Sequence, residues 1–261
     1  MDMSVLDRFR LDGQTAIVTG GNRGIGREIA DAMADVGADV VVVNRDEKTG
    51  RDAADEIADE HGVETLWVGT DVADEDSVQE MVEETVATFG TVDVLVNNAG
   101  VVSRYPAEDL SVEEFRRVLD INLTGLFLCS KYAGQVMIDD GGGSIVNVSS
   151  ISGIIANYPQ EQAHYNASKA AVDGFMTQLA SEWGTYGIRV NNINPGYITT
   201  EMVEEVTRTQ PELAETWKSN MVFDEFAGPE AIAPLAVYLA SDASSYMTGE
   251  RIIIDGGYTV R

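Results

Sequence analysis

The fold of this 261-residue chain is decided by the stretch Thr15-Ala16-Ile17-Val18-Thr19-Gly20-Gly21-Asn22-Arg23-Gly24-Ile25-Gly26. Its apolar first part predicts a buried strand, and the following residues place Ile25, Ile29, Met33 and Val36 on one face of a helix. Glycines between a strand and a helix let the backbone turn tightly, while free N–H groups and the helix dipole attract an anion. The stretch therefore predicts a turn that receives a pyrophosphate, although a glycine pattern alone is a weak signal.

Seven segments have the composition of strands, and most are rich in Val and Ile without alternation, as in strands covered on both faces. They span residues 14–19, 38–43, 65–68, 92–96, 144–148, 188–193 and 251–254. Helical patterns separate them, with stops at Gly37 and Gly90 and a capping box at Ser111-Val112-Glu113-Glu114. Alternating strands and helices predict an α/β fold with one doubly wound, seven-stranded parallel sheet.

Residues 201–227 interrupt this alternation, because they are acidic and irregular in pattern. They follow Asn194-Pro195-Gly196, which ends the sixth predicted strand. Ligands of open α/β sheets bind beyond the carboxyl ends of the strands, so an insertion here is well placed to be a substrate lid. The alternative is a pair of surface helices that contribute only packing.

The charge of the chain is unusual, since 44 acidic residues face 17 basic ones and the formal net charge is −27. The acids are spread over expected helix faces and do not form a tail. Such a chain repels itself in dilute buffer, and salt screens the repulsion. We expect adaptation to the salt-rich cytoplasm of a halophile; an unusually acidic mesophilic protein and an acidic face for a basic partner are the alternatives. The charge disfavours nucleic-acid binding.

Compartment and membrane association are predicted from three features of the sequence. No stretch of eighteen apolar residues is present, so no membrane span is expected. The first residues are acidic and lack the pattern of a signal peptide. The single cysteine, Cys129, lies in an apolar run and is expected in the core. The sequence therefore predicts a cytoplasmic protein that does not associate with a membrane.

Two later motifs add specificity to the glycine turn: Asn97-Asn98-Ala99-Gly100 and Tyr165-Asn166-Ala167-Ser168-Lys169. With the turn they resemble the signature of the short-chain dehydrogenase/reductase family, in the same order and with similar spacing. The resemblance extends from about Leu11 to Gly257. It implies a single NAD(P)-binding Rossmann domain over residues 1–261, and hydride transfer between a nicotinamide and a secondary alcohol or ketone.

The catalytic residues expected from the resemblance are Asn122, Ser150, Tyr165 and Lys169. Tyr165 and Lys169 lie one turn apart on one face of a helix predicted over 163–183, where the ammonium favours the tyrosine phenolate. The resemblance implies that Tyr165 exchanges a proton with the substrate oxygen and that Ser150 holds this oxygen. It also implies that Lys169 binds the nicotinamide ribose and that Asn122 holds a proton-relay water.

Ser152 and His164 lie close to these residues in the sequence. Ser152 lies thirteen residues before Tyr165, a common family separation, whereas Ser150 lies fifteen before; Ser150 is preferred because it directly follows a strand. His164 is adjacent to Tyr165, but side chains of successive helix residues diverge by about 100°. His164 is therefore expected on the pocket rim or the surface and not as a base. No cluster in the sequence suggests a metal site.

Contacts with the cofactor are implied at the glycine turn, at the strand ends and after the sixth strand. The residues are Gly20, Asn22, Arg23, Gly24, Ile25, Gly26, Asn44, Arg45, Asp71, Val72, Asn98, Ala99, Gly100, Tyr165, Lys169, Pro195, Gly196, Ile198 and Thr200. Asn44 stands where NAD enzymes usually place a carboxylate, and Arg23 and Arg45 suit a 2′-phosphate. NADP(H) is therefore expected; NAD(H) remains the alternative, because Asp46 could reach the 2′-hydroxyl.

The segment 157–169 resembles the branch of the family that acts on polyols, ketoses and sugar acids, and so does the segment 5–13. Polar side chains that could bind such a substrate are Asn157, Gln160, Gln162 and Tyr197. One alternative is a reductase of 3-oxoacyl thioesters, for which Arg104, Arg116 and Arg117 could form a basic landing patch; another is an enzyme that acts on steroid-like or other apolar alcohols. A non-catalytic nucleotide-binding scaffold is disfavoured, because all four catalytic residues are present. The resemblance also implies a homotetramer.

Overall fold

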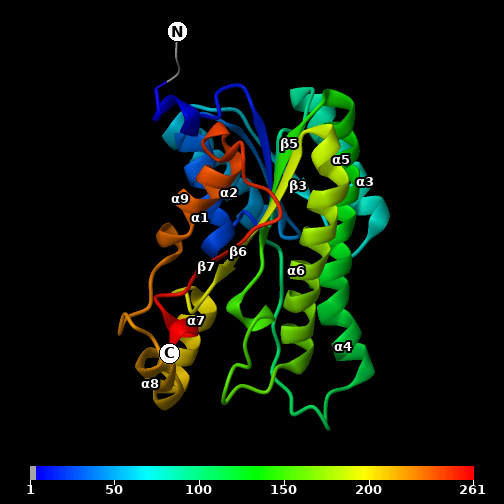
Figure 1. Ribbon diagram of the computed structural model, residues 1–261. Coiled ribbons are helices and arrows are strands. Elements are labelled where there is room, and N and C mark those ends of the chain that lie inside the picture. The colour runs from blue at the N-terminus through cyan, green and yellow to red at the C-terminus, as the bar shows by residue number, and fades with distance from the viewer. Residues whose placement is uncertain (1–3) are drawn as a thin grey trace.

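Seven parallel strands form one sheet at the centre of the molecule (Figure 1). The computed structural model describes residues 4–261. The strands are β1 (Thr15–Thr19), β2 (Asp39–Asn44), β3 (Thr65–Gly69), β4 (Val94–Asn97), β5 (Gly143–Val148), β6 (Ile188–Pro195) and β7 (Arg251–Ile254). Their order is β3-β2-β1-β4-β5-β6-β7, so the chain changes direction across the sheet between β1 and β4. This confirms the predicted doubly wound α/β fold and its seven strands.

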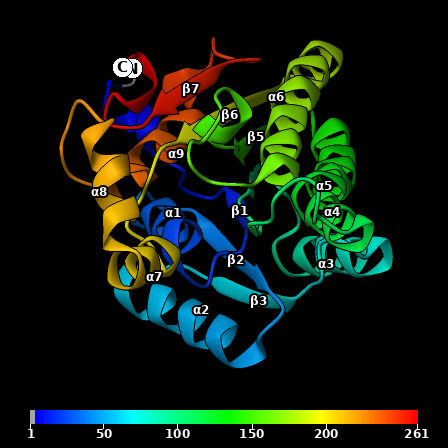
Figure 2. The ribbon, with the colours of Figure 1, turned by 90° about the horizontal axis from the view of Figure 1, so that it is seen from below.

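Helices cover both faces of the sheet, as the view along it shows (Figure 2). On one face lie α1 (Gly24–Asp35), α2 (Glu47–His61) and α9 (Ala233–Ala240); on the other lie α3 (Glu75–Phe89), α4 (Val112–Leu119), α5 (Gly125–Asp140) and α6 (Ala163–Trp183). Successive strand residues point to opposite faces, so Ala16 and Val18 pack with the α1 side and Ile17 with the α3 side. The two-sided burial explains the apolar runs without alternation.

The segment expected to be irregular is helical. It forms α7 (Glu201–Thr209) and α8 (Pro211–Ser219), and then a series of bends that ends where Ala227 pairs with Ile198. The apolar side chains of Val203 and Val206 are buried on one face of α7, and a proline occupies the first position of α8, where its missing N–H costs nothing. The irregular pattern in the sequence reflects two short helices joined by a single residue.

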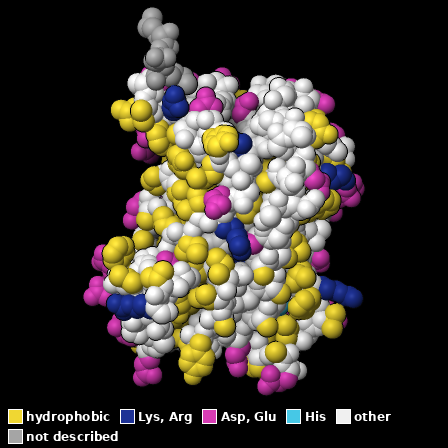
Figure 3. Space-filling view, viewed as in Figure 1, with side chains coloured by type: hydrophobic (Ala, Val, Ile, Leu, Met, Phe, Trp, Pro, Cys, Tyr) yellow, Lys and Arg dark blue, Asp and Glu magenta, His cyan; other side chains and the backbone are white. Residues whose placement is uncertain are grey.

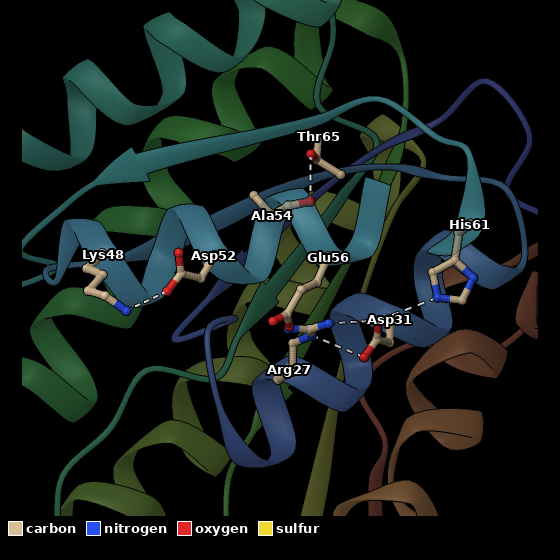
Figure 4. Close-up of polar contacts among 8 residues, drawn as sticks. All are labelled: Arg27, Asp31, Lys48, Asp52, Ala54, Glu56, His61 and Thr65. Atoms are coloured by element: carbon tan, nitrogen blue, oxygen red, sulfur yellow. Dashed lines mark hydrogen bonds and ion pairs between the residues drawn. The ribbon is translucent and has the colours of Figure 1, made fainter. Parts of the chain in front are cut away.

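Acidic side chains are scattered over the visible surface and form no single patch (Figure 3). Some are paired, as between α1 and α2, where Arg27 lies between Asp31 and Glu56 (Figure 4). His61 also reaches Asp31, and together with Glu60 these groups bring possible metal ligands within 4.8 Å of one another. The sequence did not suggest this cluster. Because the Asp31 carboxylate is already paired with Arg27, ion pairing explains why these side chains lie close together.

Two expectations concern single features of the chain. Cys129 is buried on α5, and burial raises the pKa of its thiol to about 12, so it is an inert core residue as expected. Ser111 caps α4 by accepting a hydrogen bond from the Glu114 backbone N–H, as predicted, but the Glu114 carboxylate bonds to Ser103 and Arg117 and does not complete the capping box. In the part of the chain from residue 4 onward, none of the helices has the length and apolar character that crossing a membrane requires.

Candidate active site

Two adjoining cavities open at the carboxyl ends of the strands. The first, of about 200 Å³, is lined by Ser150, Tyr165 and Lys169; the second, of about 390 Å³, is lined by the glycine turn and the end of β2. They share a wall formed by Ile25, Asn98, Gly100, Val101, Thr200 and Met202. Every residue expected to contact the cofactor lines one of the two cavities. Their arrangement matches a catalytic pocket beside a dinucleotide groove.

The glycine turn has the shape that a bound pyrophosphate requires. Gly24 begins α1 with a φ of +55°, which an L side chain rarely adopts. A Cβ atom on Gly26 would lie 2.2 Å from the Gly20 carbonyl oxygen and 2.3 Å from the Asn98 amide nitrogen. Asn98 donates to the carbonyl oxygens of Thr19 and Gly20 at 2.9 and 3.3 Å and so fixes the turn. These residues fit a dinucleotide cofactor.

The end of β2 presents an amide and not a carboxylate to the second cavity. Asn44 accepts from the Trp67 indole N–H at 2.7 Å and donates to the Asp46 carbonyl oxygen at 2.8 Å. The Asp46 carboxylate caps α2, where it accepts from the backbone N–H and the hydroxyl of Thr49, both at 2.8 Å. These hydrogen bonds lower the pKa of Asp46. The carboxylate that could have served a 2′-hydroxyl is therefore engaged by its own helix.

Arg23 and Arg45 both line the second cavity, as the sequence predicts. The Arg23 guanidinium lies 2.9 Å from a Glu201 carboxylate oxygen, and that of Arg45 lies 3.9 Å from Asp71. All four side chains are about half exposed or more. Exposed ion pairs contribute only about 0–1 kcal/mol, so an incoming phosphate can replace either carboxylate.

Tyr165 and Lys169 lie on one face of α6, at the wall of the first cavity. The Lys169 ammonium is buried, donates to the Val148 carbonyl oxygen at 2.8 Å and lies 5.8 Å from the centre of the Tyr165 ring. Burial lowers the pKa of Lys169 to about 8, against the opposing effect of Asp173. Lys169 is thus a cation at neutral pH, held there at an energetic cost.

The expected phenolate does not form in the protein by itself. Burial raises the pKa of Tyr165 above its ordinary value, although a hydrogen bond with Ser150 opposes the shift. Desolvation outweighs the attraction of an ammonium that is itself buried and almost 6 Å from the ring. Tyr165 is therefore protonated at neutral pH, in the state that a proton donor needs.

The structure distinguishes the two candidate serines. Ser150 is the one hydrogen-bonded to Tyr165, and its hydroxyl also accepts from the Ser152 backbone N–H at 3.1 Å. The Ser152 hydroxyl instead accepts from the Gln162 amide at 3.4 Å. The preference for Ser150 agrees with this geometry.

Asn122 is buried behind the first cavity and does not line it. It lies in a π-helical turn, Asp120–Thr124, between α4 and α5. Its amide oxygen accepts from the Val101 N–H, and its amide nitrogen donates to the Val101 carbonyl and to the Ser168 hydroxyl. π-Helical turns are frequent at functional sites. The side chain ties the loop after β4 to α6.

The expected position of His164 is wrong. The side chain is fully buried, and its Nε2 lies 2.7 Å from the Ser103 hydroxyl, which also bonds to Glu114. Burial lowers the pKa of His164, against the opposing charge of Glu114, so the imidazole is neutral at pH 7. The sequence could not show that the loop after β4 folds over this face of α6.

The far wall of the first cavity comes from the segment expected to be a lid, since α7 and α8 contribute Met202, Val203 and Trp217 to it. Arg104, which was considered only as part of a surface patch, lines the same cavity. The three arginines of the expected landing patch do not act together, because Arg117 is bonded to Glu114 at 2.7 Å and Arg104 faces the cavity. Arg116 and Arg117 are both exposed on α4.

Comparison with known proteins agrees with the fold and the motifs. A model of the family described as enoyl-(acyl carrier protein) reductase matches residues 20–259. Galactitol 2-dehydrogenase of Rhizobium johnstonii is 41% identical over 258 residues, which cover 98% of this chain and 99% of that protein.

Two solved structures are similar over nearly their whole length. A short-chain type dehydrogenase/reductase from Mycobacterium marinum aligns with a TM-score of 0.91 and 41% identity, covering 99% of this chain and 100% of the other. A gluconate 5-dehydrogenase from Burkholderia cenocepacia, in complex with NADP and tartrate, aligns with a TM-score of 0.94 and 31% identity over the same shares. On its motifs, its sheet and these similarities, the chain belongs to the short-chain dehydrogenase/reductase family.

Proposed function

We propose that this protein is an NADP(H)-dependent oxidoreductase that interconverts a secondary alcohol and a ketone in a polyol, ketose or sugar acid. One observation carries the proposal: Tyr165 and Ser150 meet in a cavity with a wall of amide side chains, directly beside the dinucleotide groove. The similarity to galactitol 2-dehydrogenase supports this substrate class. We place the enzyme in the cytoplasm.

The amide wall is organised around Tyr197. Its hydroxyl accepts from Gln160 at 2.9 Å and from Asn157 at 3.3 Å, and the Asn157 carbonyl oxygen accepts from Asn166 at 3.0 Å. Hydrogen bonds between neighbours hold these groups in place before a ligand arrives. A site built to hydrogen-bond hydroxyl groups rejects analogues that lack them, because its polar groups then stay unpaired. The wall therefore suits a substrate with several hydroxyls.

The proton transfer follows from the protonation states of the site. When bound, NADPH supplies a hydride to the carbonyl carbon of the substrate. Ser150 donates a hydrogen bond to the carbonyl oxygen, and the protonated Tyr165 transfers its proton to the same oxygen as negative charge develops there. The Lys169 ammonium stabilises the phenolate that remains and binds the nicotinamide ribose. Asn122 supports the loop behind it and holds the relay water that the family resemblance implies.

Preference for NADP(H) is assigned to Arg23 and Arg45. Their guanidinium groups lie at the edge of the second cavity next to Asn44, and their present carboxylate partners are exposed and weakly held. Bidentate hydrogen bonds from arginine to a phosphate are stronger than these surface pairs. Asp46 is the residue that could favour NAD(H) by binding the 2′-hydroxyl, and its carboxylate is already held in the cap of α2.

Residues 201–227 act as the substrate lid in this proposal, because α7 and α8 contribute Met202, Val203 and Trp217 to the wall of the catalytic cavity. We also propose that the protein is a homotetramer and that its surface is adapted to high salt. Phe127 of α5 is 43% exposed and packs edge-on against Phe175 of α6, which leaves apolar surface on two helices available for a second subunit. Sedimentation in molar KCl tests the assembly.

The decisive experiment is an assay of NADPH and NADH oxidation in molar KCl against ketoses, keto sugar acids and acetoacetyl coenzyme A. Turnover of a ketose or keto acid, faster with NADPH, is the expected result. Tyr165→Phe is the matched control, because it removes a single oxygen and should retain cofactor binding without turnover. Reduction of the thioester alone would contradict the proposed substrate class, and faster turnover with NADH would contradict the roles of Arg23 and Arg45.

A further inference from the structure

A hydrogen bond between neighbouring strands holds the polar residue at the end of β2. The Nε1–H group of Trp67, on β3, donates to the Asn44 amide oxygen at 2.7 Å. Both residues are partly buried, and the parallel pairing of the strands places Val42 opposite Trp67 and Asn44 opposite Gly69. Asn44 lines the second cavity, whereas Trp67 does not. Trp67 can therefore influence a bound cofactor only through Asn44.

The helix that packs on this pair leaves room for the contact. Gly50 lies within α2, and a Cβ atom there would lie 2.0 Å from the Trp67 indole nitrogen and 2.2 Å from the Asn44 amide oxygen. Glycine is unfavourable inside a helix, so its presence at this point calls for a packing reason. The guanidinium carbon of Arg51, also on α2, lies 4.7 Å from the centre of the Trp67 ring. The helix thus holds the indole while its N–H group stays directed at Asn44.

The hydrogen bond determines which atom of Asn44 faces which neighbour. An indole nitrogen can only donate, so the amide oxygen must face Trp67. The amide nitrogen then donates to the Asp46 carbonyl oxygen at 2.8 Å, and it has a longer contact, of 3.4 Å, with the Thr49 hydroxyl. That hydroxyl oxygen already accepts from Asn22 at 3.0 Å. One N–H of Asn44 is therefore weakly bonded at the wall of the second cavity.

A phosphate and a hydroxyl make different demands on this amide. The anionic oxygens of a phosphate accept hydrogen bonds, so N–H groups attract them and a carbonyl oxygen repels them. A hydroxyl donates as well as accepts, and it can pair with either atom of an amide. Arg23 and Arg45 line the same cavity and supply positive charge. The orientation of Asn44 can thus distinguish the two groups at the 2′ position of a cofactor.

We propose that Trp67 is a positioning residue for the adenosine 2′-phosphate of NADP(H): its indole N–H holds the Asn44 amide oxygen away from the second cavity, so that position 44 offers N–H donors to the phosphate. The inference rests on the proposed function and deepens its preference for NADP(H). Trp67 lines neither cavity and acts through Asn44. Without the indole N–H the amide is free to turn, and its oxygen can then face the phosphate.

Equilibrium binding of two adenosine nucleotides tests this assignment without requiring turnover. Adenosine 2′,5′-bisphosphate and adenosine 5′-monophosphate differ only in the 2′-phosphate. Calorimetric titration at fixed molar KCl should show that the wild type binds the bisphosphate more tightly. Trp67→Phe should weaken bisphosphate binding by about 3- to 10-fold, the range for loss of one hydrogen bond, and leave monophosphate binding unchanged.

Two further variants separate the hydrogen bond from the packing of the indole. Gly50→Ala places a methyl group between the indole nitrogen and the amide oxygen but keeps the indole, so it should give the same selective loss. In an Asn44→Ala background, Trp67→Phe should change bisphosphate affinity by less than about twofold, because no amide remains to be oriented. Trp183→Phe is the matched control, since Trp183 ends α6 and lines neither cavity. It should leave both affinities within about twofold of the wild type.

Four results would overturn the assignment. They are equal wild-type affinity for the two nucleotides, equal losses for both in Trp67→Phe, an undiminished preference for the bisphosphate in Trp67→Phe, and a loss that persists in the Asn44→Ala background. The first of these would also contradict the preference for NADP(H), whereas the other three leave that preference standing.

Kinetics separates this inference from the proposed reaction. In Trp67→Phe the KM for NADPH should rise while kcat stays unchanged, because the change lies at the 2′-phosphate end of the cofactor groove. If the bisphosphate preference depends on Trp67 but NADPH reduces no ketone, the proposed reaction fails and the role of Trp67 stands. If NADPH reduces a ketone and Trp67→Phe leaves its KM unchanged, the role of Trp67 fails and the proposed function stands.

Discussion

Replacing Lys169 by methionine should remove activity and change the pH dependence of stability in a defined direction. Burial lowers the pKa of Lys169 from 10.5 to about 8, which corresponds to about 3 kcal/mol at about 1.4 kcal/mol for each pKa unit. Between these two values the unfolded chain holds a proton that the folded chain has lost. Wild-type stability therefore gains this contribution as pH rises from 8 towards 10.5.

Lys169→Met has no titratable group at this position, so it cannot gain this contribution to stability as pH rises. Its free energy of unfolding relative to the wild type should thus be highest near pH 7 and should fall by about 3 kcal/mol by pH 10.5. Loss of the hydrogen bond to the Val148 carbonyl subtracts about 1 kcal/mol at every pH, so the pH dependence is the cleaner quantity. Repulsion among the acids is common to both proteins and cancels in the difference.

Urea unfolding at fixed molar KCl, at intervals from pH 7 to pH 10, measures the difference. Lys131→Met is the matched control, because Lys131 is partly exposed and its ion pair with Glu75 raises its pKa. The stability that Lys131 contributes is lost, not gained, as pH rises through its folded-state pKa. A difference between wild type and Lys169→Met that stays constant to within about 0.5 kcal/mol would refute the reasoning.

Three further predictions concern cofactor, chemistry and salt. Tyr165→Phe should lower kcat by about 10²- to 10⁴-fold, as for loss of a general acid, with cofactor affinity by fluorescence titration unchanged. Arg45→Gln should raise KM for NADPH about tenfold and leave KM for NADH unchanged, since only NADPH carries the 2′-phosphate; equal effects on both cofactors would contradict the assignment. Dilution from molar to millimolar KCl should lower the Tm, because 44 acidic residues then repel one another without screening; a Tm independent of salt would contradict adaptation to salt.

The fold was predictable because its signals are local. Strands such as β2 are buried on both faces, so their apolar runs stand out, and helix ends carry their own signals, as at Gly90 and Ser111. The catalytic pair Tyr165 and Lys169 was predictable for the same reason, since four residues of helix bring the two together.

The parts that sequence analysis missed depend on contacts between distant segments. His164 is buried because the loop after β4 packs over α6, sixty-one residues away along the chain from Ser103. Arg104 faces the cavity because α8 supplies Trp217 as its support. Neither contact leaves a periodic pattern in the sequence. The upward shift of the Tyr165 pKa could not be predicted either, because spacing shows the neighbouring charge but not the burial of both groups.

The hydrogen bonds around Asn44 limit how the cofactor preference of this enzyme could be redesigned. The usual route from NADP to NAD is a carboxylate at the end of the second strand. Aspartate at position 44 would keep the bond from the Trp67 indole but could no longer donate to the Asp46 carbonyl, which would face a second oxygen. Because this contact is exposed, water can satisfy the carbonyl, but the two oxygens would repel each other at the present distance, so a redesign must also reshape the turn that leads into α2.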